Sequence, residues 1–546
     1  MRLCSALVAA FLFASALSAA DLSGVWEAKR RFGPDARGAI ILQREGTAWR
    51  GDFLGRQFPV QEQNGVLTFT LPEGSFRGRI GHDGFWTQER KTTDGNAFTT
   101  PVRFTRESPT QWRGEVVPLD ETFTFYLVLQ RTEDGAYSAF LRNPERNVGV
   151  FLNVTRATLD GTNVKLYRKE NVLTTGTYDA DRDVLTIDFS NRGGTYDFTR
   201  AAASSAFHAR PASHYSYRPP LQRNDGWRVD TLENAKIDRA AIEKFVQMLI
   251  DTPIDSVHAP DVHALLIARH GKLVLEEYFH GHSREALHEM RSATKSVTSL
   301  LFGAAGLSPS TPVYESLGAA TGDERKRALR AEHLLTMSSG FYCDDSDDKA
   351  PGNENTLQEQ ENEKDWYRFT LNLPMSEAPG AKAVYCSVNA NLLGAMIARA
   401  THEPLAESFD RLIARPLQFD RYALNIQPTG EAYMAGGMQL TARDFLKIGQ
   451  VMLSGGKWHG RTIVSADYAR RATSPLTHIG NSGYGYLWWN DRKSFYADGN
   501  GGQTVIVVPE LDLVIAFFGG NYADRTGSIA RREWVPEFVL PAVGRN

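Results

Sequence analysis

Residues 290–301 read Met-Arg-Ser-Ala-Thr-Lys-Ser-Val-Thr-Ser-Leu-Leu. Ser292 and Lys295 stand three positions apart at the start of an apolar run with helical periodicity, in which Val297 and Leu301 fall on one side. Side chains at positions i and i+3 of an α-helix share a face, so the Lys295 amine can reach the Ser292 hydroxyl. A lysine there can hold or accept the hydroxyl proton, and a helix start offers free N–H groups to an oxyanion. The stretch therefore predicts an activated serine at the start of a helix.

The same spacing of serine and lysine occurs at two other places, Ser346 with Lys349 and Ser454 with Lys457. Two glycines separate Ser454 from its lysine, and a double glycine does not readily continue a helix. Ser346 lies in an acidic run followed by a proline and a glycine, which is typical of a solvated loop. Ser292 is thus the candidate nucleophile, and the alternative is a serine that only caps a helix.

The composition of the chain bounds its class. It has 546 residues, of which 42% are hydrophobic and 23% charged, and its formal net charge is -3. A single core rarely grows to this length, so we expect two or three domains. The near-neutral charge gives no electrostatic reason to expect a nucleic-acid partner.

The first twenty residues combine an early arginine, an apolar run and a small-residue end at Ser18-Ala19-Ala20. This pattern is typical of a cleavable secretory signal peptide. Its apolar core is too short to span a bilayer, and no later stretch has the ~20 apolar residues that a span needs. We therefore expect a soluble mature protein that is periplasmic or secreted and has no transmembrane segment.

Residues 21–201 show the period-two alternation of strands, as in Thr122–Leu129, with turn dipeptides such as Asn64-Gly65 between short apolar segments. We predict an all-β antiparallel barrel or sandwich here. Gly24-Val25-Trp26 resembles the Gly-x-Trp opening of lipocalin-type barrels. A buried tryptophan that closes one end of a barrel explains this short match better than ligand binding does. We expect an accessory domain that binds a ligand or shapes access to the second domain.

Residues 202–229 are rich in alanine, serine, proline and aromatic residues, which favours a linker before a second domain over residues 230–546. In that domain, strand patterns lie near both ends and helical patterns lie between them. This order predicts an α+β fold in which distant segments form one sheet. We expect helices near 240–250, 391–400, 441–453 and 531–540, a hairpin over 262–279, and strands over 485–489, 504–508 and 513–518.

The motifs of several other enzyme classes are missing from the sequence, namely Gly-x-Ser-x-Gly, His-Glu-x-x-His, a phosphate loop and a dinucleotide fingerprint. The thirteen histidines are scattered, so each is expected to be a surface or core residue, and neither metal nor cofactor is expected. Tyr385 is a candidate base, because a neighbouring cation such as Lys295 would lower the pKa of its phenol. Taken alone, Tyr385 is better explained as an aromatic residue packed on a strand.

Four segments occur in an order that resembles the serine β-lactamase and penicillin-binding-protein superfamily. They are Ser292-Ala293-Thr294-Lys295, Leu334–Gly340, Pro379-Gly380 leading to Tyr385, and Gly499-Asn500-Gly501-Gly502-Gln503. The resemblance covers roughly residues 230–546. It is strongest to the class C-like branch, which contains esterases, D-aminopeptidase-like proteins and aminohexanoate-oligomer hydrolases. It implies a β-lactamase-like α+β fold, with an antiparallel sheet flanked by helices and a helical subdomain.

The resemblance also implies roles for individual residues. Ser292 would be acylated, and Lys295 and Tyr385 would share the role of base. The oxyanion would lie between the backbone N–H group of Ser292 and that of a residue on the late strand, at Gly499 or Asn500.

This chain departs from the superfamily pattern at two places. The usual Tyr-x-Asn is replaced by Tyr385-Cys386-Ser387, so Ser387 or the later Asn389 is expected to contact the substrate. The usual Lys-Thr-Gly aligns with Ala497-Asp498-Gly499, which removes the cation that would bind the carboxylate of a β-lactam or of peptidoglycan. The second departure argues against a β-lactamase or D,D-peptidase and favours neutral or amine-bearing esters and amides.

Two cysteines remain after the signal peptide. Cys343 follows the Leu334–Gly340 segment, which the superfamily places near the site, and Cys386 adjoins Tyr385. With export expected, a disulfide between the two is a hypothesis, and the alternative is two buried thiols. The acidic segment Asp344–Asp348, followed by the polar run Asn353–Lys364, is either a substrate lid or a solvated loop.

The leading hypothesis is an exported serine hydrolase that cleaves a small ester or amide through an acyl-enzyme at Ser292. One alternative is a non-catalytic or weakly catalytic ligand-binding protein on the same scaffold. The other is a β-lactamase or D,D-peptidase. The sequence specifies neither the substrate nor the oligomeric state.

Overall fold

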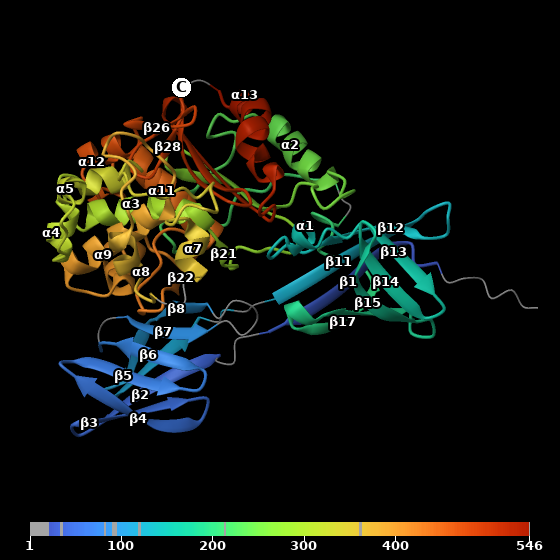
Figure 1. The fold of residues 1–546 in the computed structure, drawn as a ribbon, viewed down its shortest axis with the longest axis horizontal. Coiled ribbons are helices and arrows are strands. Elements are labelled where there is room, and N and C mark those ends of the chain that lie inside the picture. The colour runs from blue at the N-terminus through green and yellow to red at the C-terminus, as the bar shows by residue number, and fades with distance from the viewer. Residues whose placement is uncertain are drawn as a thin grey trace, which may run out of the picture.

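The computed structural model describes residues 21–32, 37–80, 83–89, 96–117, 119, 122–211, 214–359 and 363–544. The predicted signal peptide, residues 1–20, lies outside the described residues. Within these ranges, no helix is both long and apolar enough to cross a membrane. Two β units and a larger C-terminal α+β domain make up the described part of the chain (Figure 1).

The first β unit is a closed antiparallel barrel, as predicted. Trp26 is fully buried in its core, donates its indole N–H to the Leu22 carbonyl at 2.8 Å, and lies under the Arg200 guanidinium. The Gly-x-Trp match is therefore explained by packing at the barrel end. The barrel strands are β1 (Gly24–Arg31), β11 (Thr122–Arg131), β12 (Tyr137–Arg142), β13 (Arg156–Asp160), β14 (Asn163–Arg168), β15 (Asn171–Asp179), β16 (Val184–Phe189) and β17 (Gly194–Arg200).

The second β unit is inserted between the first two barrel strands. The sequence predicts one domain over residues 21–201, whereas β1 pairs with the distant β11, in the register Gly24 to Leu129. Period-two alternation identifies strands but does not reveal which strands pair, so the insertion could not be seen. Its strands are β2 (Gly38–Glu45), β3 (Ala48–Phe53), β4 (Arg56–Gln63), β5 (Val66–Leu71), β6 (Gly74–Gly78), β7 (Gly84–Glu89), β8 (Ala97–Val102), β9 (Phe104–Ser108) and β10 (Gln111–Val116).

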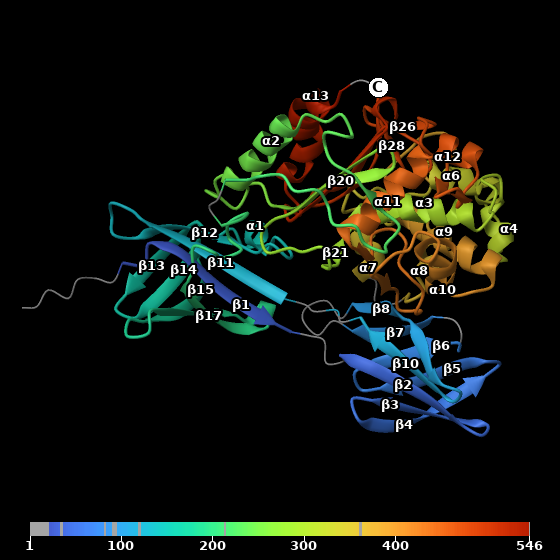
Figure 2. The ribbon, with the colours of Figure 1, turned by 180° about the vertical axis from the view of Figure 1, so that it is seen from behind.

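The inserted sheet continues into the C-terminal domain. Strand β8 pairs with β22 (Tyr422–Ile426), which pairs with β23 (Met438–Leu440) and through it with β21 (His288–Glu289). In Figures 1 and 2, β8 is the part of the insertion next to the C-terminal domain. Strand pairing therefore joins the insertion to the segment that leads into the Ser292 turn.

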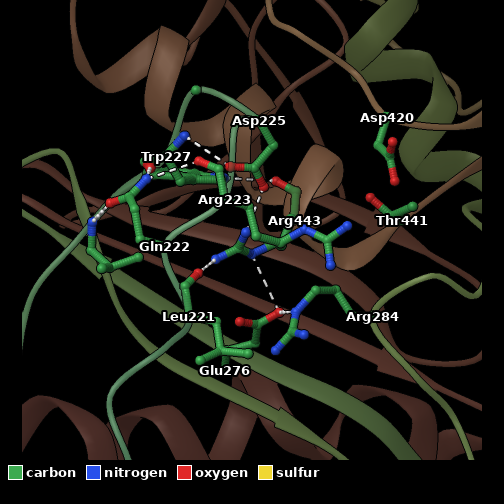
Figure 3. Close-up of polar contacts among 12 residues, drawn as sticks. Leu221, Gln222, Arg223, Asp225, Trp227, Glu276, Arg284, Asp420, Thr441 and Arg443 are labelled. Atoms are coloured by element: carbon green, nitrogen blue, oxygen red, sulfur yellow. Dashed lines mark hydrogen bonds and ion pairs between the residues drawn. The ribbon is translucent and has the colours of Figure 1, made fainter.

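Residues 202–229 are not a free linker. Tyr215 and Tyr217 are buried in the core of the C-terminal domain. The buried Arg443 guanidinium forms an ion pair with Asp225 at 2.6 Å and donates a hydrogen bond to the Leu221 carbonyl at 2.8 Å (Figure 3). Composition alone indicated a linker because it does not show that aromatic side chains anchor the segment.

The C-terminal domain contains a nine-stranded sheet covered by helices on both faces. Leu265 and Ile267 pack against α2 (Arg239–Asp251) and the π-helix Ala530–Val539, whereas Leu266 and Ala268 face α3 (Thr294–Ala304) and α11 (Ala442–Leu453). The sheet order is β18 (Arg228–Val229), β20 (Lys272–Tyr278), β19 (Val262–Arg269), β31 (Leu513–Gly519), β30 (Gln503–Val508), β29 (Phe495–Gly499), β28 (Trp489–Asn490), β27 (Ser482–Tyr484) and β26 (Thr477–Ile479).

The structure confirms most of the predicted elements of this domain, but the strand over 485–489 is wrong. The Gly485 N–H donates to the Trp488 carbonyl, so residues 485–488 form a turn between β27 and β28, and only Trp489 lies on a strand. The predicted helical subdomain lies on the α3 side of the sheet. Its helices are α4 (Val313–Leu317), α5 (Glu324–Ala328), α6 (Ala331–Leu335), α7 (Glu354–Glu359), α8 (Trp366–Asn372), α9 (Ser387–Thr401) and α10 (Leu405–Phe409).

Candidate active site

Ser292 lies in a 3₁₀ turn, Arg291–Ala293, between β21 and α3. The end of β29 packs directly against this turn. A Cβ on Gly499 would collide with the Met290 carbonyl oxygen and would lie 3.1 Å from the Ala293 nitrogen, so only glycine fits there. The fold therefore holds the backbone of the late strand next to the candidate nucleophile, as the resemblance implied.

Lys295 occupies the first turn of α3 and points back to the serine. Its Nζ donates a hydrogen bond to Ser292 Oγ at 3.0 Å and another to the Ala435 carbonyl at 2.8 Å. The side chain is 1% exposed, so these contacts fix the ammonium without competing water. The i to i+3 relation read from the sequence thus places the two groups in direct contact.

Tyr385 completes this group, although it does not lie on a strand. It lies in the loop that precedes α9, with its ring stacked on Trp489 at 5.5 Å between centroids. Ser292 and Lys295 are the two groups that favour ionisation of its phenol, and Lys295 Nζ lies 4.9 Å from its ring centroid. Three side chains from two segments, the stretch 292–295 and the loop before α9, therefore lie together.

Burial sets the protonation of this group. Desolvation raises the pKa of Tyr385 above its ordinary value, although the charge of Lys295 opposes the shift. Burial alone would lower the pKa of Lys295, but the charges of Tyr385, Glu354 and Asp345 outweigh it, and that pKa is also raised. Lys295 does act to lower the pKa of Tyr385, as predicted, but desolvation outweighs the cation and the net pKa is raised. At neutral pH both groups carry a proton.

Ser387 and Asn389 lie behind the tyrosine rather than beside the serine. The Ser387 backbone N–H and hydroxyl both donate to Asp345 Oδ2, at 2.8 and 2.7 Å. Asn389 is fully buried in α9, with its Nδ2 directed at the Met337 sulfur at 3.6 Å. The predicted substrate contact of these two residues is therefore not formed, because α9 turns both side chains into the core.

A disulfide joins Cys343 to Cys386, with the Cα atoms 5.9 Å apart. It ties the segment before Asp345 to the residue that follows Tyr385. Within the acidic segment, Asp345 is partly buried and accepts a hydrogen bond from the first N–H group of α9. Asp347 and Asp348 are exposed. Most of that segment is therefore a solvated loop, and only the Asp345 carboxylate binds to the start of α9, next to Tyr385.

A cavity of about 300 Å³ opens at Ser292. Asn500 lies on its wall, with its side-chain oxygen turned away to accept a hydrogen bond from the Ala523 N–H at 2.8 Å. The remaining wall residues include Asn96, Phe98, Arg146, Glu289, Arg291, Glu354, Trp366, Tyr433 and Gln439.

The two β units supply part of this wall, which the sequence did not reveal. Phe98 comes from β8 of the insertion, and Arg146 comes from the segment after the barrel strand β12. Arg146 pairs with Glu289 at 2.5 Å, and Glu289 also pairs with Arg291 at 2.8 Å. The expectation that the accessory region shapes access to the second domain thus has a structural basis. No local motif could have signalled it, because the contacts join segments more than a hundred positions apart.

The C-terminal domain is similar to known proteins. A family model described as Beta-lactamase matches residues 250–526, about half of the chain. The chain is 26% identical over 282 residues to a 6-aminohexanoate-dimer hydrolase from Paenarthrobacter ureafaciens, covering 46% of this chain and 71% of that protein.

Similar solved structures include two penicillin-binding proteins. A homologue from Caulobacter crescentus has 14% identity and a TM-score of 0.43, covering 53% of this chain and 94% of its own. A protein from Bacillus halodurans has 15% identity and a TM-score of 0.42, covering 54% of this chain and 99% of its own.

Proposed function

Because this chain belongs to the Beta-lactamase family and has a hydrolase among its relatives, we propose that it is a serine hydrolase of small esters or amides. Ser292 is the proposed nucleophile, and Lys295 and Tyr385 are the proposed base. The observation that carries the proposal is the 3.0 Å hydrogen bond from Lys295 Nζ to Ser292 Oγ, with the same ammonium 4.9 Å from the centre of the Tyr385 ring. A serine hydroxyl is a weak nucleophile at neutral pH, and it becomes an effective one when a neighbouring base takes its proton.

In the proposed first step, which starts from the fraction of protein in which Tyr385 has lost its proton, Ser292 Oγ attacks the substrate carbonyl carbon while its proton passes to the Tyr385 phenolate. The oxyanion accepts hydrogen bonds from the backbone N–H groups of Ser292 and Asn500. Collapse breaks the bond to the alcohol or amine, which takes the proton from Tyr385. Water then attacks the acyl carbon by the same route, releasing the acid and returning the proton to Ser292.

Two features support an ester or amide substrate over a β-lactam. The strand position that carries a lysine in the superfamily pattern is the buried Ala497. The next residue is an acid, Asp498, whose pKa is raised to about 6 by burial and which lies 3.6 Å from Arg531. A substrate carboxylate would meet no lysine on this strand. The cavity of about 300 Å³ fits a short acyl group rather than a peptidoglycan strand.

We also propose that the protein is exported. Support comes from the signal-like pattern of residues 1–20 and from the disulfide, since disulfides persist in oxidising compartments. A periplasmic or secreted location would give the enzyme small external substrates.

A substrate panel tests the proposed function. The purified protein is incubated with p-nitrophenyl esters of graded chain length, matching amides, D-amino-acid amides and benzylpenicillin. We expect turnover to be greatest with short esters or amides. Stable acylation by benzylpenicillin without turnover of esters would favour the penicillin-binding alternative. If the folded protein turned over none of these compounds, a binding protein on the same scaffold would be the better conclusion.

The pH dependence of the reaction follows from the raised pKa values. Since both Tyr385 and Lys295 hold their protons at neutral pH, the base form becomes more abundant as the pH rises. We expect kcat/KM to increase by up to about tenfold per pH unit above neutrality, with no descending limb below the pKa of the base. The measurement is kcat/KM for a short ester from pH 6 to 10, corrected for spontaneous hydrolysis. A profile that is flat or falls over this range would contradict the assignment.

A further inference from the structure

Three histidines that are scattered in the sequence converge next to the Ser292 turn. His263 lies at the start of β19, His282 in the turn after β20, and His288 in β21. One ring nitrogen from each lies within 4.8 Å of the others. The separations are too irregular to form a motif, which is why no metal was expected from the sequence.

The hydrogen bonds of two of these rings cannot all be satisfied by neutral histidines. His288 Nδ1 lies 3.1 Å from the Glu289 carbonyl, an acceptor, so this nitrogen carries the proton and Nε2 keeps its lone pair. His288 Nε2 lies 2.8 Å from His263 Nδ1, which must then donate. The other nitrogen of His263, Nε2, is left unprotonated 3.3 Å from the carboxylate oxygen Asp261 Oδ1. A lone pair of His263 Nε2 and a lone pair of Asp261 Oδ1 therefore face each other at a buried position.

In the opposite tautomer of His263, the contact with Asp261 is satisfied but the contact with His288 is not. With its proton on Nε2, His263 can donate to Asp261, but then two bare nitrogens face each other at 2.8 Å. His263 is 1% exposed, and its Nε2 forms no hydrogen bond with any described residue, so bulk solvent does not relieve either arrangement. One additional positive charge between the His263 and His288 rings would remove the conflict.

We propose that His263, His282 and His288 bind a divalent transition-metal ion, with Zn²⁺ as the best match to three imidazole ligands. The ion takes the lone pairs of His263 Nδ1 and His288 Nε2, and the protonated His263 Nε2 then donates to Asp261. This is the carboxylate–histidine–metal chain that orients ligands in zinc sites. The His282 ring, now stacked on His263 at 3.8 Å, turns to present its nitrogen, and water is the fourth ligand.

The cluster lies where a bound ion would hold two parts of the structure together. His288 and Glu289 form β21, and Ser292 follows three residues after Glu289. Asp261, behind His263, pairs with Arg142 of the barrel at 2.9 Å. A bound ion would therefore fix the segment that leads into the active-site turn and the contact between the barrel and the C-terminal domain (Figure 2).

Metal analysis of the full chain tests the proposal. The protein is stripped with dipicolinate, equilibrated with Zn²⁺ or Co²⁺ at pH 7.5, desalted and assayed by mass spectrometry of the metal. We expect about one Zn²⁺ per chain, visible absorption of tetrahedral Co²⁺, and a higher melting temperature with Zn²⁺ than without it. His282→Ala is expected to lose the Co²⁺ absorption and the Zn²⁺-dependent shift. His282 is partly exposed, so this change spares the core.

His478→Ala is the matched control, because His478 is exposed on β26 and lies outside the cluster. It is expected to keep the metal and the shift. If the wild-type protein takes up no stoichiometric Zn²⁺ or Co²⁺, the proposal is overturned. Unchanged uptake in a folded His282→Ala protein would overturn it equally, since the three-histidine site would not be the one that binds.

Discussion

Replacing Ser292 with alanine is expected to lower the hydrolysis of a short ester by roughly 10⁴- to 10⁶-fold, the range seen when a serine hydrolase loses its nucleophile. The change removes the only atom that can form the acyl bond in the proposed mechanism, and it leaves Lys295 bound to the Ala435 carbonyl. Stability should change little, because Ser292 is only partly buried. The measurement is kcat/KM with a thermal melt of both proteins.

The chain offers its own control for this substitution. Ser346 also precedes a lysine by three residues, but it lies on the exposed loop and donates its hydroxyl to Asp344 at 2.6 Å. Ser346→Ala is expected to keep full activity. A Ser292→Ala protein that is folded and retains more than a few per cent of wild-type turnover would exclude Ser292 as the nucleophile.

Replacing Tyr385 with phenylalanine is expected to slow acylation by about 10²- to 10⁴-fold, the usual contribution of a positioned general base. The ring and its stacking on Trp489 remain, so the loss isolates the contribution of the hydroxyl, whose ionisation Ser292 and Lys295 favour. The measurement is the pre-steady-state release of p-nitrophenol. The alkaline rise of kcat/KM should also flatten, which a purely structural role of the hydroxyl would not cause.

Tyr484→Phe is the matched control for this experiment. Tyr484 is buried, and its ring packs edge-to-face against Tyr385 at 6.4 Å. Its substitution removes a hydroxyl from the same aromatic cluster and should leave acylation within a fewfold of wild type. If Tyr385→Phe and Tyr484→Phe behave alike, the base is not Tyr385.

Local sequence signals predicted the centre of the site well. The relation of Ser292 to Lys295 depends only on helix geometry, and strand alternation predicted the barrel and the sheet hairpin. Tyr385 required the order of the superfamily segments, since nothing in its own surroundings marks it. Its raised pKa could not be read from the sequence, because the balance between the Lys295 charge and desolvation depends on how completely the fold buries the pair.

Long-range pairing produced the features that the sequence did not predict. Thr99 of the insertion faces Leu424 across a strand pair, and Arg146 of the barrel unit reaches Glu289 beside the cavity. Such contacts are set by topology and not by local periodicity. The same cause brought the three histidines together and packed residues 202–229 onto the domain. Sequence reasoning therefore located the candidate nucleophile but not the walls around it.

The most direct measurement is the site of covalent labelling by a fluorophosphonate, which traps a serine that can be acylated. The protein is labelled at pH 8, digested, and analysed by mass spectrometry of its peptides. The account predicts one modified residue, Ser292, with labelling lost in Ser292→Ala and strongly slowed in Tyr385→Phe. Labelling at another serine, or an unlabelled peptide containing Ser292 in folded wild-type protein, would contradict it.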